Sequence, residues 1–377
     1  MTGRQKIEAA FSAEGTDQFG VVLPYPGIYM RDHWDSLTRC PWWYEQSQSI
    51  EQQMDWRRDV FPRIGQDWFA LRSLLPREDR EASSIEVAAD GVFLANSRTG
   101  ARIRLEEPRV SGWSEREEWY SVNPNHLADT ADEIDSLIPC AEDLDLEAVR
   151  ASGIADLSDA MLSEFGREMY PICHVSSPLW NCYGLWGFDG MMTMIASRPD
   201  LVERACQRYL RLGLQNVRVA AMLGARGIWI EECLTDMISP AAFRSLNLPV
   251  VRRLVDEIRA AGLKSIYYYC GDPSGKWEQI LSVGADALSL EEGKKGFDID
   301  IRDVVERVQG KCVVFGNLDA IGTLQNGTVD QLQAEVSRQL AAGRENGGRF
   351  VMSLGSPVTP ETSVERVQLY CDMVRST

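Results

Sequence analysis

The chain has 377 residues, 44% of them hydrophobic, which is enough to build one large domain or two smaller ones around a substantial core. A formal net charge of −17 argues against a nucleic-acid partner, because phosphate binding needs a basic face. Nine scattered cysteines, a start without the apolar core of a signal peptide, and the lack of any bilayer-length apolar run predict a cytoplasmic protein that does not enter a membrane.

The first predicted element is a strand at residues 19–25 (FGVVLPY). The segment that follows it is rich in tryptophan, in DHWDSLTRCPWWYEQ, QMDWRRDVF and GQDWFALR, and these rings are expected mostly to pack the core. Two β-rich arms joined by glycine and serine turn residues predict a hairpin within residues 84–107. The acidic segment 128–148 is expected to form a solvated surface of loop and helix. We interpret residues 1–160 as a first strand with a capping extension.

Residues 161–377 alternate short apolar β-rich runs with helical patterns, which predicts βαβ units and a parallel sheet. The predicted helices include 239–262, with Ser239 as N-cap and Gly262 as the C-terminal stop, and also 329–348 and 360–376. The predicted strands are 169–175, 227–231, 264–269, 286–290, 312–316 and 350–354.

With the first strand these make seven, and one more completes a (β/α)8 TIM barrel. A doubly wound sheet has the same alternation, but no Gly-x-Gly-x-x-Gly opens a helix after the first strand. We therefore predict a single-domain α/β fold, a TIM barrel with an N-terminal extension that contains a β-hairpin. In this fold catalytic residues lie at the carboxyl ends of the strands, where this sequence carries Cys173-His174, Glu231-Glu232-Cys233, Cys270-Gly271-Asp272, Glu291-Glu292, Asn317-Leu318-Asp319 and Gly355-Ser356.

Several motifs from Tyr170 onward resemble the uroporphyrinogen decarboxylase superfamily in their order. They include PICHVSSPLWNCYGLWGFDG, GARGIWIEECLTDMISPAAF, KSIYYYCGD, GADALSLEE, VFGNLDAIGTLQNGT and LGSPVTPETSVERV. The superfamily contains the decarboxylase itself and methyltransferases that work with corrinoid proteins and coenzyme M or related acceptors. The resemblance implies a (β/α)8 barrel with its site at the carboxyl ends of the strands, and it is closest to the methyltransferase branch.

The methyltransferase branch carries His-x-Cys after one strand and a later cysteine in a Gly-Cys context, and these residues hold Zn²⁺, which lowers the pKa of a substrate thiol. In this sequence Tyr268 stands at the histidine position, Cys270 is retained, and Ser356 stands at the later cysteine position. Glu232 and Glu291 match acidic family positions and are expected at the ends of neighbouring strands. The predicted zinc ligands are therefore Cys270, Glu232 and Glu291.

The decarboxylase branch carries Met-Arg-Gln-Ala-Gly-Arg after its first strand, where the arginines bind the carboxylates of the porphyrinogen. IYMRDHWD keeps Met30 and Arg31 but has Asp35 where the second arginine should fall, and a histidine expected near the last strand is Ser356. A strongly acidic chain is a poor host for a substrate with many carboxylates. The resemblance thus disfavours porphyrinogen decarboxylation.

The remaining candidates follow from their places near strand ends. The predicted catalytic residues are His33, Arg31, His174 and Tyr268, because histidine suits proton transfer at neutral pH and the tyrosine can donate a hydrogen bond. The predicted substrate-binding residues are Trp34, Asn317 and Ser356. Each has a structural alternative: a lone histidine is often satisfied by packing, a buried cysteine is often a small apolar residue, and a glutamate at a turn is often a surface charge.

The leading hypothesis is a methyltransferase that moves a methyl group between a small substrate and a corrinoid protein, with possible activation by zinc. The chain has no Asp-x-His-x-x-Gly, so the corrinoid would be carried by a partner protein. The alternatives are a metal-free lyase that uses His33, Arg31 and His174 in a decarboxylation, and a non-catalytic binding relative.

Overall fold

The computed structural model describes residues 1–108, 124, 126–140, 143–293 and 296–377. It forms a TIM barrel, as predicted: eight strands lie in one sheet in the order β1-β11-β10-β9-β8-β7-β6-β2, and every hydrogen-bonded pair is parallel. The strands of this barrel are β1 Gly20–Val21, β2 Trp68–Ala70, β6 Tyr170–Ser176, β7 Gly227–Glu232, β8 Lys264–Tyr269, β9 Ala287–Leu290, β10 Val313–Phe315 and β11 Phe350–Met352.

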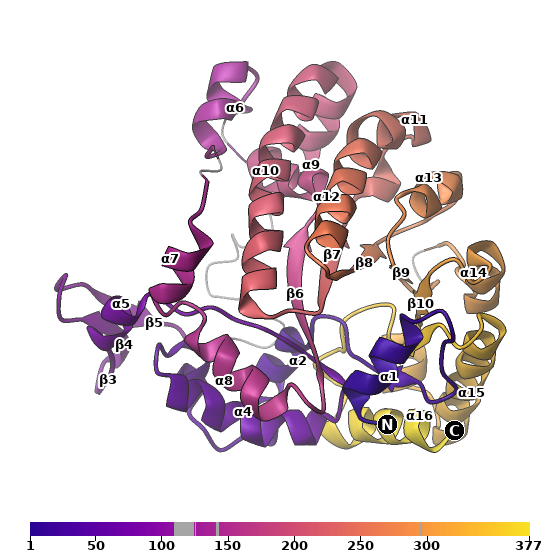
Figure 1. The fold of residues 1–377 in the computed structure, drawn as a ribbon, viewed down its shortest axis with the longest axis horizontal. Coiled ribbons are helices and arrows are strands. Elements are labelled where there is room, and N and C mark those ends of the chain that lie inside the picture. The colour runs from indigo at the N-terminus through magenta and orange to yellow at the C-terminus, as the bar shows by residue number, and fades with distance from the viewer. Residues whose placement is uncertain (109–123, 125, 141–142, 294–295) are drawn as a thin grey trace.

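Helices surround the barrel (Figure 1). Those of the N-terminal part are α1 Gly3–Ala10, α2 Pro26–Asp32, α3 Trp34–Leu37, η1 Trp42–Gln46, α4 Ile50–Ile64, α5 Arg77–Glu81, α6 Ala131–Leu137 and α7 Leu146–Ala151. The others are α8 Asp156–Phe165, α9 Pro178–Ser197, α10 Pro199–Leu223, η4 Thr235–Met237, α11 Pro240–Ala242, η5 Phe243–Asn247, α12 Leu248–Ala260, α13 Trp277–Ser282, α14 Ile301–Val308, η6 Ala320–Gln325, α15 Val329–Glu345 and α16 Val364–Ser376. No helix within the described part of the chain has both the length and the hydrophobicity needed to cross a membrane.

The predicted helix at 239–262 is interrupted in the structure. Ser239 accepts a hydrogen bond from the Ala242 backbone N–H and so caps α11, as predicted. A π-helical turn, η5, then separates α11 from α12, and such turns are frequent at functional sites. This turn carries Asn247, whose side chain contacts the end of β7.

The eighth barrel strand, β2, lies in GQDWFALR, a stretch that the sequence analysis assigned to the capping extension. Its Trp68 ring fills the barrel interior, and the indole N–H donates to the Leu23 carbonyl at 3.1 Å. Phe69 points outward into the layer between sheet and helices. The N-terminal segment therefore supplies two barrel strands rather than one, and β2 escaped prediction because it has only three residues.

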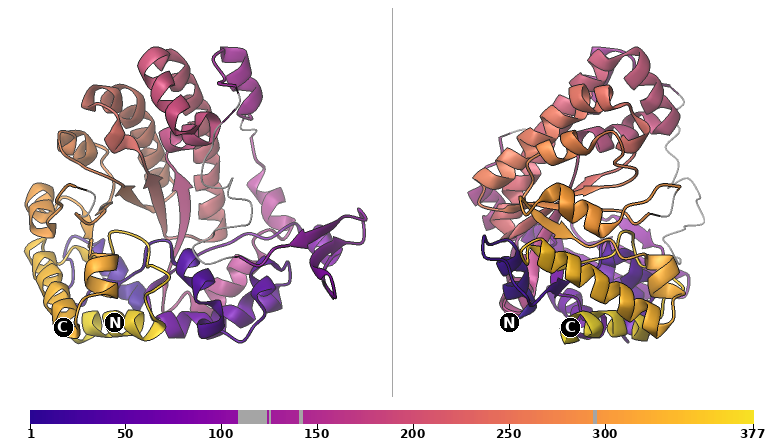
Figure 2. Two further views of the ribbon diagram at one scale, coloured as in Figure 1. Left: turned by 180° about the vertical axis from the view of Figure 1, so that it is seen from behind. Right: turned by 90° about the vertical axis from the view of Figure 1, so that its right-hand side faces the viewer.

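The predicted hairpin is confirmed and is extended by a third strand. Strands β3 Ser83–Ala88, β4 Gly91–Asn96 and β5 Arg102–Leu105 form an antiparallel sheet of their own. This sheet projects from the side of the barrel (Figures 1 and 2). We call residues 83–105 the arm.

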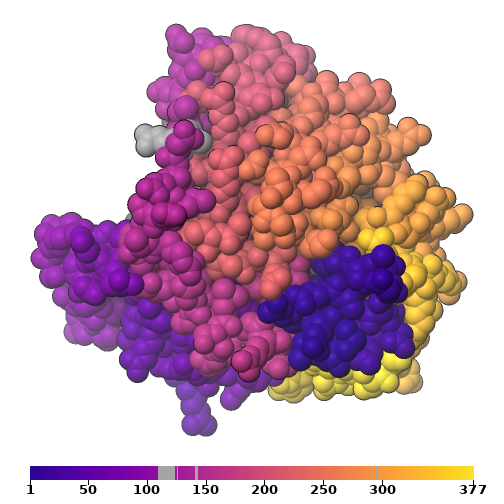
Figure 3. All heavy atoms as spheres, in the orientation of Figure 1, coloured from indigo at the N-terminus to yellow at the C-terminus, as the bar shows by residue number. Residues whose placement is uncertain are grey.

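The barrel closes between β1 and β2 through a side chain. The Asp67 carboxylate accepts the Val21 backbone N–H at 2.8 Å, and the Asp67 N–H donates to the Val21 carbonyl at 2.8 Å. The other carboxylate oxygen of Asp67 accepts from Arg375 of α16 at 3.0 Å. The seam thus ties both ends of the chain together, and Figure 3 shows the N-terminal and C-terminal residues side by side on the surface.

Replacement of Asp67 by alanine is expected to lower the free energy of unfolding by about 2–4 kcal/mol, because it leaves the buried Val21 backbone N–H without its acceptor and removes one of the partners of Arg375. Urea denaturation of the full chain measures this change. Asp67→Asn keeps one acceptor oxygen and should cost clearly less. A change of under about 0.5 kcal/mol for the alanine variant would mean that the seam does not depend on this carboxylate.

Candidate active site

Side chains alternate between the two faces of each barrel strand, and this alternation decides which residues reach the interior. On β8, Tyr268 packs in the inner core, while Tyr267 and Tyr269 pack in the outer layer under the helices. On β7, Trp229 lies in the inner core, and its ring stacks on that of Tyr268 at 5.0 Å. These two rings form an apolar base for the carboxyl-end opening of the barrel, which we call the mouth.

Tyr25 also belongs to the mouth, although the sequence analysis did not select it. Its backbone lies in the left-handed region, with φ 50° and ψ 45°, a conformation that costs a non-glycine residue free energy and is enriched at functional sites. The Tyr25 hydroxyl accepts from the Trp229 indole N–H at 3.3 Å, and its ring lies 5.8 Å from Tyr268 and 6.1 Å from His174. Its place at the end of FGVVLPY was the available signal.

Two thiols meet at the mouth. Cys270 follows β8 and Cys233 follows β7, and both side chains are half-buried. The neighbouring Cys270 thiol, together with burial, raises the pKa of Cys233. The Glu231 carboxylate raises it further, and it also accepts from the Ser176 hydroxyl at 3.3 Å. Cys233 thus has the Cys270 sulfur and the Glu231 carboxylate as neighbours, and Cys233 and Glu231 are residues that the predicted ligand set lacked.

Glu232 does not lie at the mouth. It is fully buried behind β7, where its carboxylate accepts from Ser177 at 2.7 Å, from the Asn247 amide at 2.7 Å and from the Tyr267 hydroxyl at 3.2 Å. Burial raises the pKa of Glu232 to about 7. Since Tyr267 belongs to the outer layer and Cys270 packs against the inner core, the predicted convergence of Cys270, Glu232 and Glu291 is wrong for Glu232.

Glu291 and Glu232 are also not on neighbouring strands, because β8 lies between β7 and β9. Glu291 is buried near the inner-face phenol of Tyr268. Desolvation raises the pKa of Tyr268 most, and the charges of Cys270 and Glu291 raise it further. The Tyr268 hydroxyl donates to the Gly355 carbonyl at 2.9 Å, so this side chain spans the barrel from β8 to the loop after β11.

Ser356 and Asn317, two of the predicted substrate-binding residues, form hydrogen bonds that hold loops at the ends of other strands. The Ser356 hydroxyl donates to Glu292 at 2.8 Å, which links the loops after β11 and β9. The Asn317 amide donates to the carbonyls of Glu291 and Ile299, at 3.2 and 2.9 Å. Asn317 thus holds the backbone at Glu291, which is a positioning contact within the protein.

His174 lies on the inner face of β6, with its ring 6.3 Å from that of Trp229. Solvent reaches the ring, although protein atoms surround it on most sides. Desolvation lowers the pKa of His174 below its usual value, so the imidazole is neutral at pH 7. The structure therefore places His174 at the mouth, together with Tyr25, Tyr268 and Cys270.

Three further predicted residues, His33, Arg31 and Trp34, follow the first strand and do not lie at the mouth. The His33 ring packs on Tyr29, at 4.4 Å, in the outer layer, and Arg31 pairs with Asp32 at 3.2 Å. Trp34 is a core residue whose indole N–H donates to the Cys40 carbonyl at 2.6 Å. The structure thus does not bring His33 and Arg31 together with His174, because α2 carries them away from the inner face.

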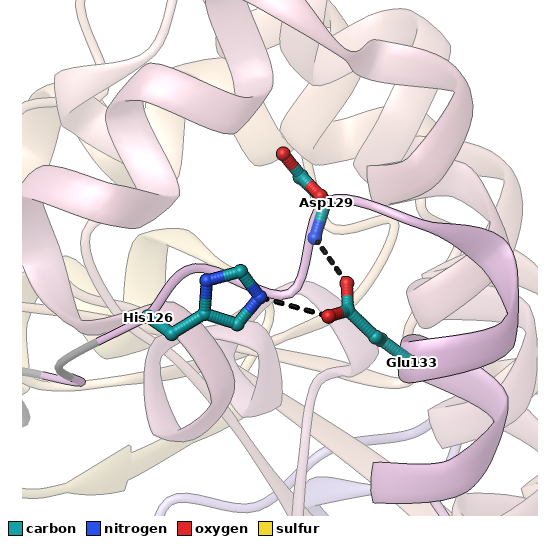
Figure 4. Close-up of side chains that lie close together, drawn as sticks. All are labelled: His126, Asp129 and Glu133. Atoms are coloured by element: carbon teal, nitrogen blue, oxygen red, sulfur yellow. Dashed lines mark hydrogen bonds and ion pairs between the residues drawn. The ribbon is translucent and has the colours of Figure 1, made fainter.

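Among the residues that the structure describes, one group of three metal-ligand side chains has all its ligand atoms within 4.8 Å of one another: His126, Asp129 and Glu133. It lies on the surface, where His126 Nε2 is 2.8 Å from Glu133 and the Asp129 N–H donates to Glu133 at 3.1 Å (Figure 4). The Glu133 carboxylate also accepts from the Thr130 N–H and so completes the N-terminal cap of α6. These contacts explain the cluster as a capping structure.

A model of the family described as Uroporphyrinogen decarboxylase (URO-D) matches residues 116–377. Uroporphyrinogen decarboxylase of Neisseria meningitidis serogroup C is 26% identical over 201 residues, which cover 51% of this chain and 54% of that protein. Uroporphyrinogen decarboxylase of Thermodesulfovibrio yellowstonii is 26% identical over 175 residues, which cover 46% of each chain. The chain therefore spans about half the length of the curated relatives it matches.

A solved structure described as a methyltransferase from Methanosarcina mazei superposes with a TM-score of 0.67 at 16% sequence identity. The superposition covers 100% of this chain and 98% of that one. At this identity the likeness establishes the fold, which includes the N-terminal segment outside the family match.

Proposed function

The chain belongs to the uroporphyrinogen decarboxylase family, and within that family we propose that it is a methyltransferase, which moves a methyl group between a small substrate and a corrinoid protein. The observation that carries this proposal is the Cys270 thiol, half-buried at the carboxyl end of β8, where it matches the retained cysteine of the methyltransferase branch. A thiol at this place is both a nucleophile and a soft metal ligand. The methyltransferase from Methanosarcina mazei, which shares the fold over the whole chain, supports the same choice.

The groups around Cys270 suit a small, largely uncharged substrate. Trp229 and Tyr268 present apolar surface that excludes water. Desolvation raises the pKa of Tyr25, so its hydroxyl stays protonated and can donate a hydrogen bond. The neutral His174 can accept or donate a hydrogen bond without adding a positive charge.

Zinc is the metal that the family resemblance implies, and the ligand set predicted from the sequence does not fit it, since Glu232 faces the helices. The Cys270 and Cys233 thiols and the Glu231 carboxylate are ligand types that suit a soft divalent cation, but their ligand atoms do not all lie within 4.8 Å of one another, so they would have to close around the ion. These three residues would hold the ion. When bound, zinc would lower the pKa of a substrate thiol and favour its thiolate, the form that attacks a methyl group.

A metal-free decarboxylase remains the alternative, because the curated relatives carry that name. Its predicted carboxylate-binding residue, Arg31, is paired with Asp32, and His33 packs in the outer layer. A decarboxylase would therefore have to work with His174 alone among the predicted proton-transfer residues. These contacts favour the methyltransferase.

The proposal predicts that the purified chain accelerates transfer of the methyl group from free methylcobalamin to at least one of a panel of small thiols. The reference is the rate of the same reaction without the protein. The visible absorption spectrum of the cobalamin follows the reaction, and metal analysis of the same sample should find zinc. An unchanged spectrum with release of carbon dioxide from a porphyrinogen would establish the decarboxylase instead. Saturable binding of small molecules without turnover of either kind would identify a binding protein.

A further inference from the structure

The pair of cysteines at the mouth differs in exposure from a second pair in the core. Cys182 of α9 and Cys206 of α10 have their sulfurs 3.8 Å apart, and both side chains are fully buried. Packing explains this second pair, because a buried cysteine behaves as a small apolar residue. Cys233 and Cys270 follow β7 and β8 and are only half-buried, so dissolved reagents can reach them.

The two thiols at the mouth are neighbours across the sheet. The parallel register of β7 and β8 pairs Glu232 with Tyr269, and the Cys270 N–H continues the ladder by donating to the Glu232 carbonyl at 2.9 Å. Cys233 and Cys270 are the next residues on their two strands, so they lie opposite each other. Alternation along both strands turns their side chains to the inner face of the barrel.

This placement meets the geometric demand of a disulfide. Neighbouring strands lie about 4.8 Å apart, and the Cα atoms that a disulfide joins are roughly 4.4–6.8 Å apart. The Cys270 thiol also raises the pKa of Cys233, an effect that requires the two side chains to be close. Rotation of the two side chains can therefore bring the sulfurs into bonding contact while the barrel backbone stays in place.

The loops behind the two thiols hold them in this position. A side chain at Gly271, which has a φ of 109°, would collide with the carboxylate of Asp236 in the loop after β7. Lys276 joins the same loops by donating to the Asp236 carbonyl at 3.1 Å. Leu234, directly after Cys233, has a left-handed backbone with φ 62°, a conformation that clusters at functional sites. The thiols are thus kept side by side by contacts that do not involve sulfur.

The charge around the pair selects the oxidant. The Glu231 carboxylate lies beside Cys233, and the chain carries a net charge of −17. Both features oppose the approach of an anionic oxidant such as glutathione disulfide. Hydrogen peroxide is small and uncharged, so it can enter the mouth and react with a half-buried thiol.

We propose that Cys233 and Cys270 form a reversible disulfide with hydrogen peroxide as the oxidant, and that this bond blocks the site at the mouth. One thiol loses its proton and attacks the peroxide, which gives a sulfenic acid and one water molecule. The second sulfur then attacks the sulfenic sulfur, and a second water molecule leaves as the S–S bond forms. The two electrons that the thiols lose reduce the peroxide, and a dithiol reductant reverses the change.

The effect of the disulfide on activity rests on the proposed function, which assigns Cys270 as a nucleophile and a metal ligand. In the disulfide neither sulfur can attack a methyl group or bind a cation, since both tasks need a thiolate. The oxidised protein should therefore transfer methyl groups roughly 100-fold more slowly than the reduced protein. Treatment with a dithiol should restore the rate.

Peptide mapping tests the bond independently of any activity. Trypsin cuts after lysine and arginine, so Cys233 falls in residues 227–244 and Cys270 in residues 265–276, each as the one cysteine of its peptide. Chelator-treated protein that has reacted with an equimolar amount of hydrogen peroxide should yield these two peptides joined, lighter by two hydrogen atoms than their sum. This product should be roughly 10-fold or more as abundant as any link between Cys182 and Cys206, which the oxidant reaches poorly.

Two variants separate the mouth pair from the buried pair. Cys233→Ser removes one of the two sulfurs, so the oxidation of Cys270 should stop at the sulfenic acid, which dimedone traps. Cys206→Ala is the matched control from the buried pair, and it should form the same disulfide as the wild type. Thermal unfolding of both variants checks that the barrel is intact.

The outcomes distinguish the disulfide from the proposed function. Recovery of the two peptides unlinked, or linked no more often than the buried pair, would overturn the disulfide. A disulfide that forms while methyl transfer keeps its full rate would overturn the block. Reduced protein that transfers no methyl group would contradict the proposed function instead, and the peptide map would still decide whether the disulfide forms.

Discussion

Replacement of Cys270 by serine is expected to lower the rate of methyl transfer by roughly 100-fold or more, which corresponds to about 3 kcal/mol of lost transition-state stabilisation. Serine has nearly the same size, so the barrel should fold normally, but its hydroxyl is a poor soft-metal ligand and a weak nucleophile at neutral pH. The measurement is the initial rate of methylcobalamin demethylation at saturating thiol, with zinc content determined on the same preparation. Both quantities should fall together.

Cys312 provides the matched control. Its thiol is also half-buried, but it precedes β10 and so lies at the amino end of the barrel, away from the mouth. Cys312→Ser should keep the full rate and the full zinc content. If Cys270→Ser behaves in the same way, the thiol has no part in the reaction, and the methyltransferase mechanism loses its main support.

Glu232→Ala is expected to destabilise the fold by about 3–5 kcal/mol. The substitution leaves the Asn247 amide and the hydroxyls of Ser177 and Tyr267 without their shared acceptor in a fully buried place. Guanidinium denaturation measures the loss. The matched control is Glu231→Ala, one residue earlier and half-buried on the inner face, which should cost less than about 1 kcal/mol of stability. Equal losses for the two variants would contradict the assignment of faces.

The same carboxyl group makes stability depend on pH. The folded pKa of Glu232, about 7, lies above its ordinary value of 4.5, so the folded state binds the proton more tightly than the unfolded state. The stabilisation is fully present below pH 4.5 and is lost as the pH rises through 7. The wild type should therefore lose about 3 kcal/mol more than Glu232→Gln between pH 4.5 and 8. Parallel curves for the two proteins would show that Glu232 does not titrate in this range.

The fold was predictable because parallel strands of a barrel are buried on both faces and read as apolar runs between helices. Six of the C-terminal runs and the first strand became barrel strands. β2 could not be recognised, because its three residues owe their strand conformation to pairing with β6 and to the Asp67 seam rather than to a local pattern.

The candidate site was predictable in place but not in orientation. Cys270 and His174 reach the mouth because they share the inner face with Tyr268 and Trp229. Glu232 was chosen by its match to a family position, whereas alternation along β7 from the inner residue Trp229 leads to Glu231 and Cys233. The period of two was therefore a better guide to the site than the family position.

His33 and Arg31 show a limit that no strand pattern removes. They follow the first strand closely, yet Arg31 lies on α2 and His33 caps its C-terminal end, so their side chains contact the residues packed around that helix, such as Tyr29, and not the barrel interior. Whether such a residue reaches the mouth depends on contacts with segments distant in the sequence, such as the loop at Thr359 and Pro360 that adjoins His33.

A ring whose first strand pairs with its last cannot close while the chain is still being synthesised. Gly20 pairs with Val351, and Asp67 is bound by Arg375, so the free edge of β1 stays uncovered until the ribosome has released these late residues. Nascent chains should therefore depend on chaperones that shield strand edges. A product that stops before α16 keeps the two bonds between Asp67 and Val21 but lacks the Arg375 contact to Asp67, so its seam should be weaker and more readily cleaved by proteases.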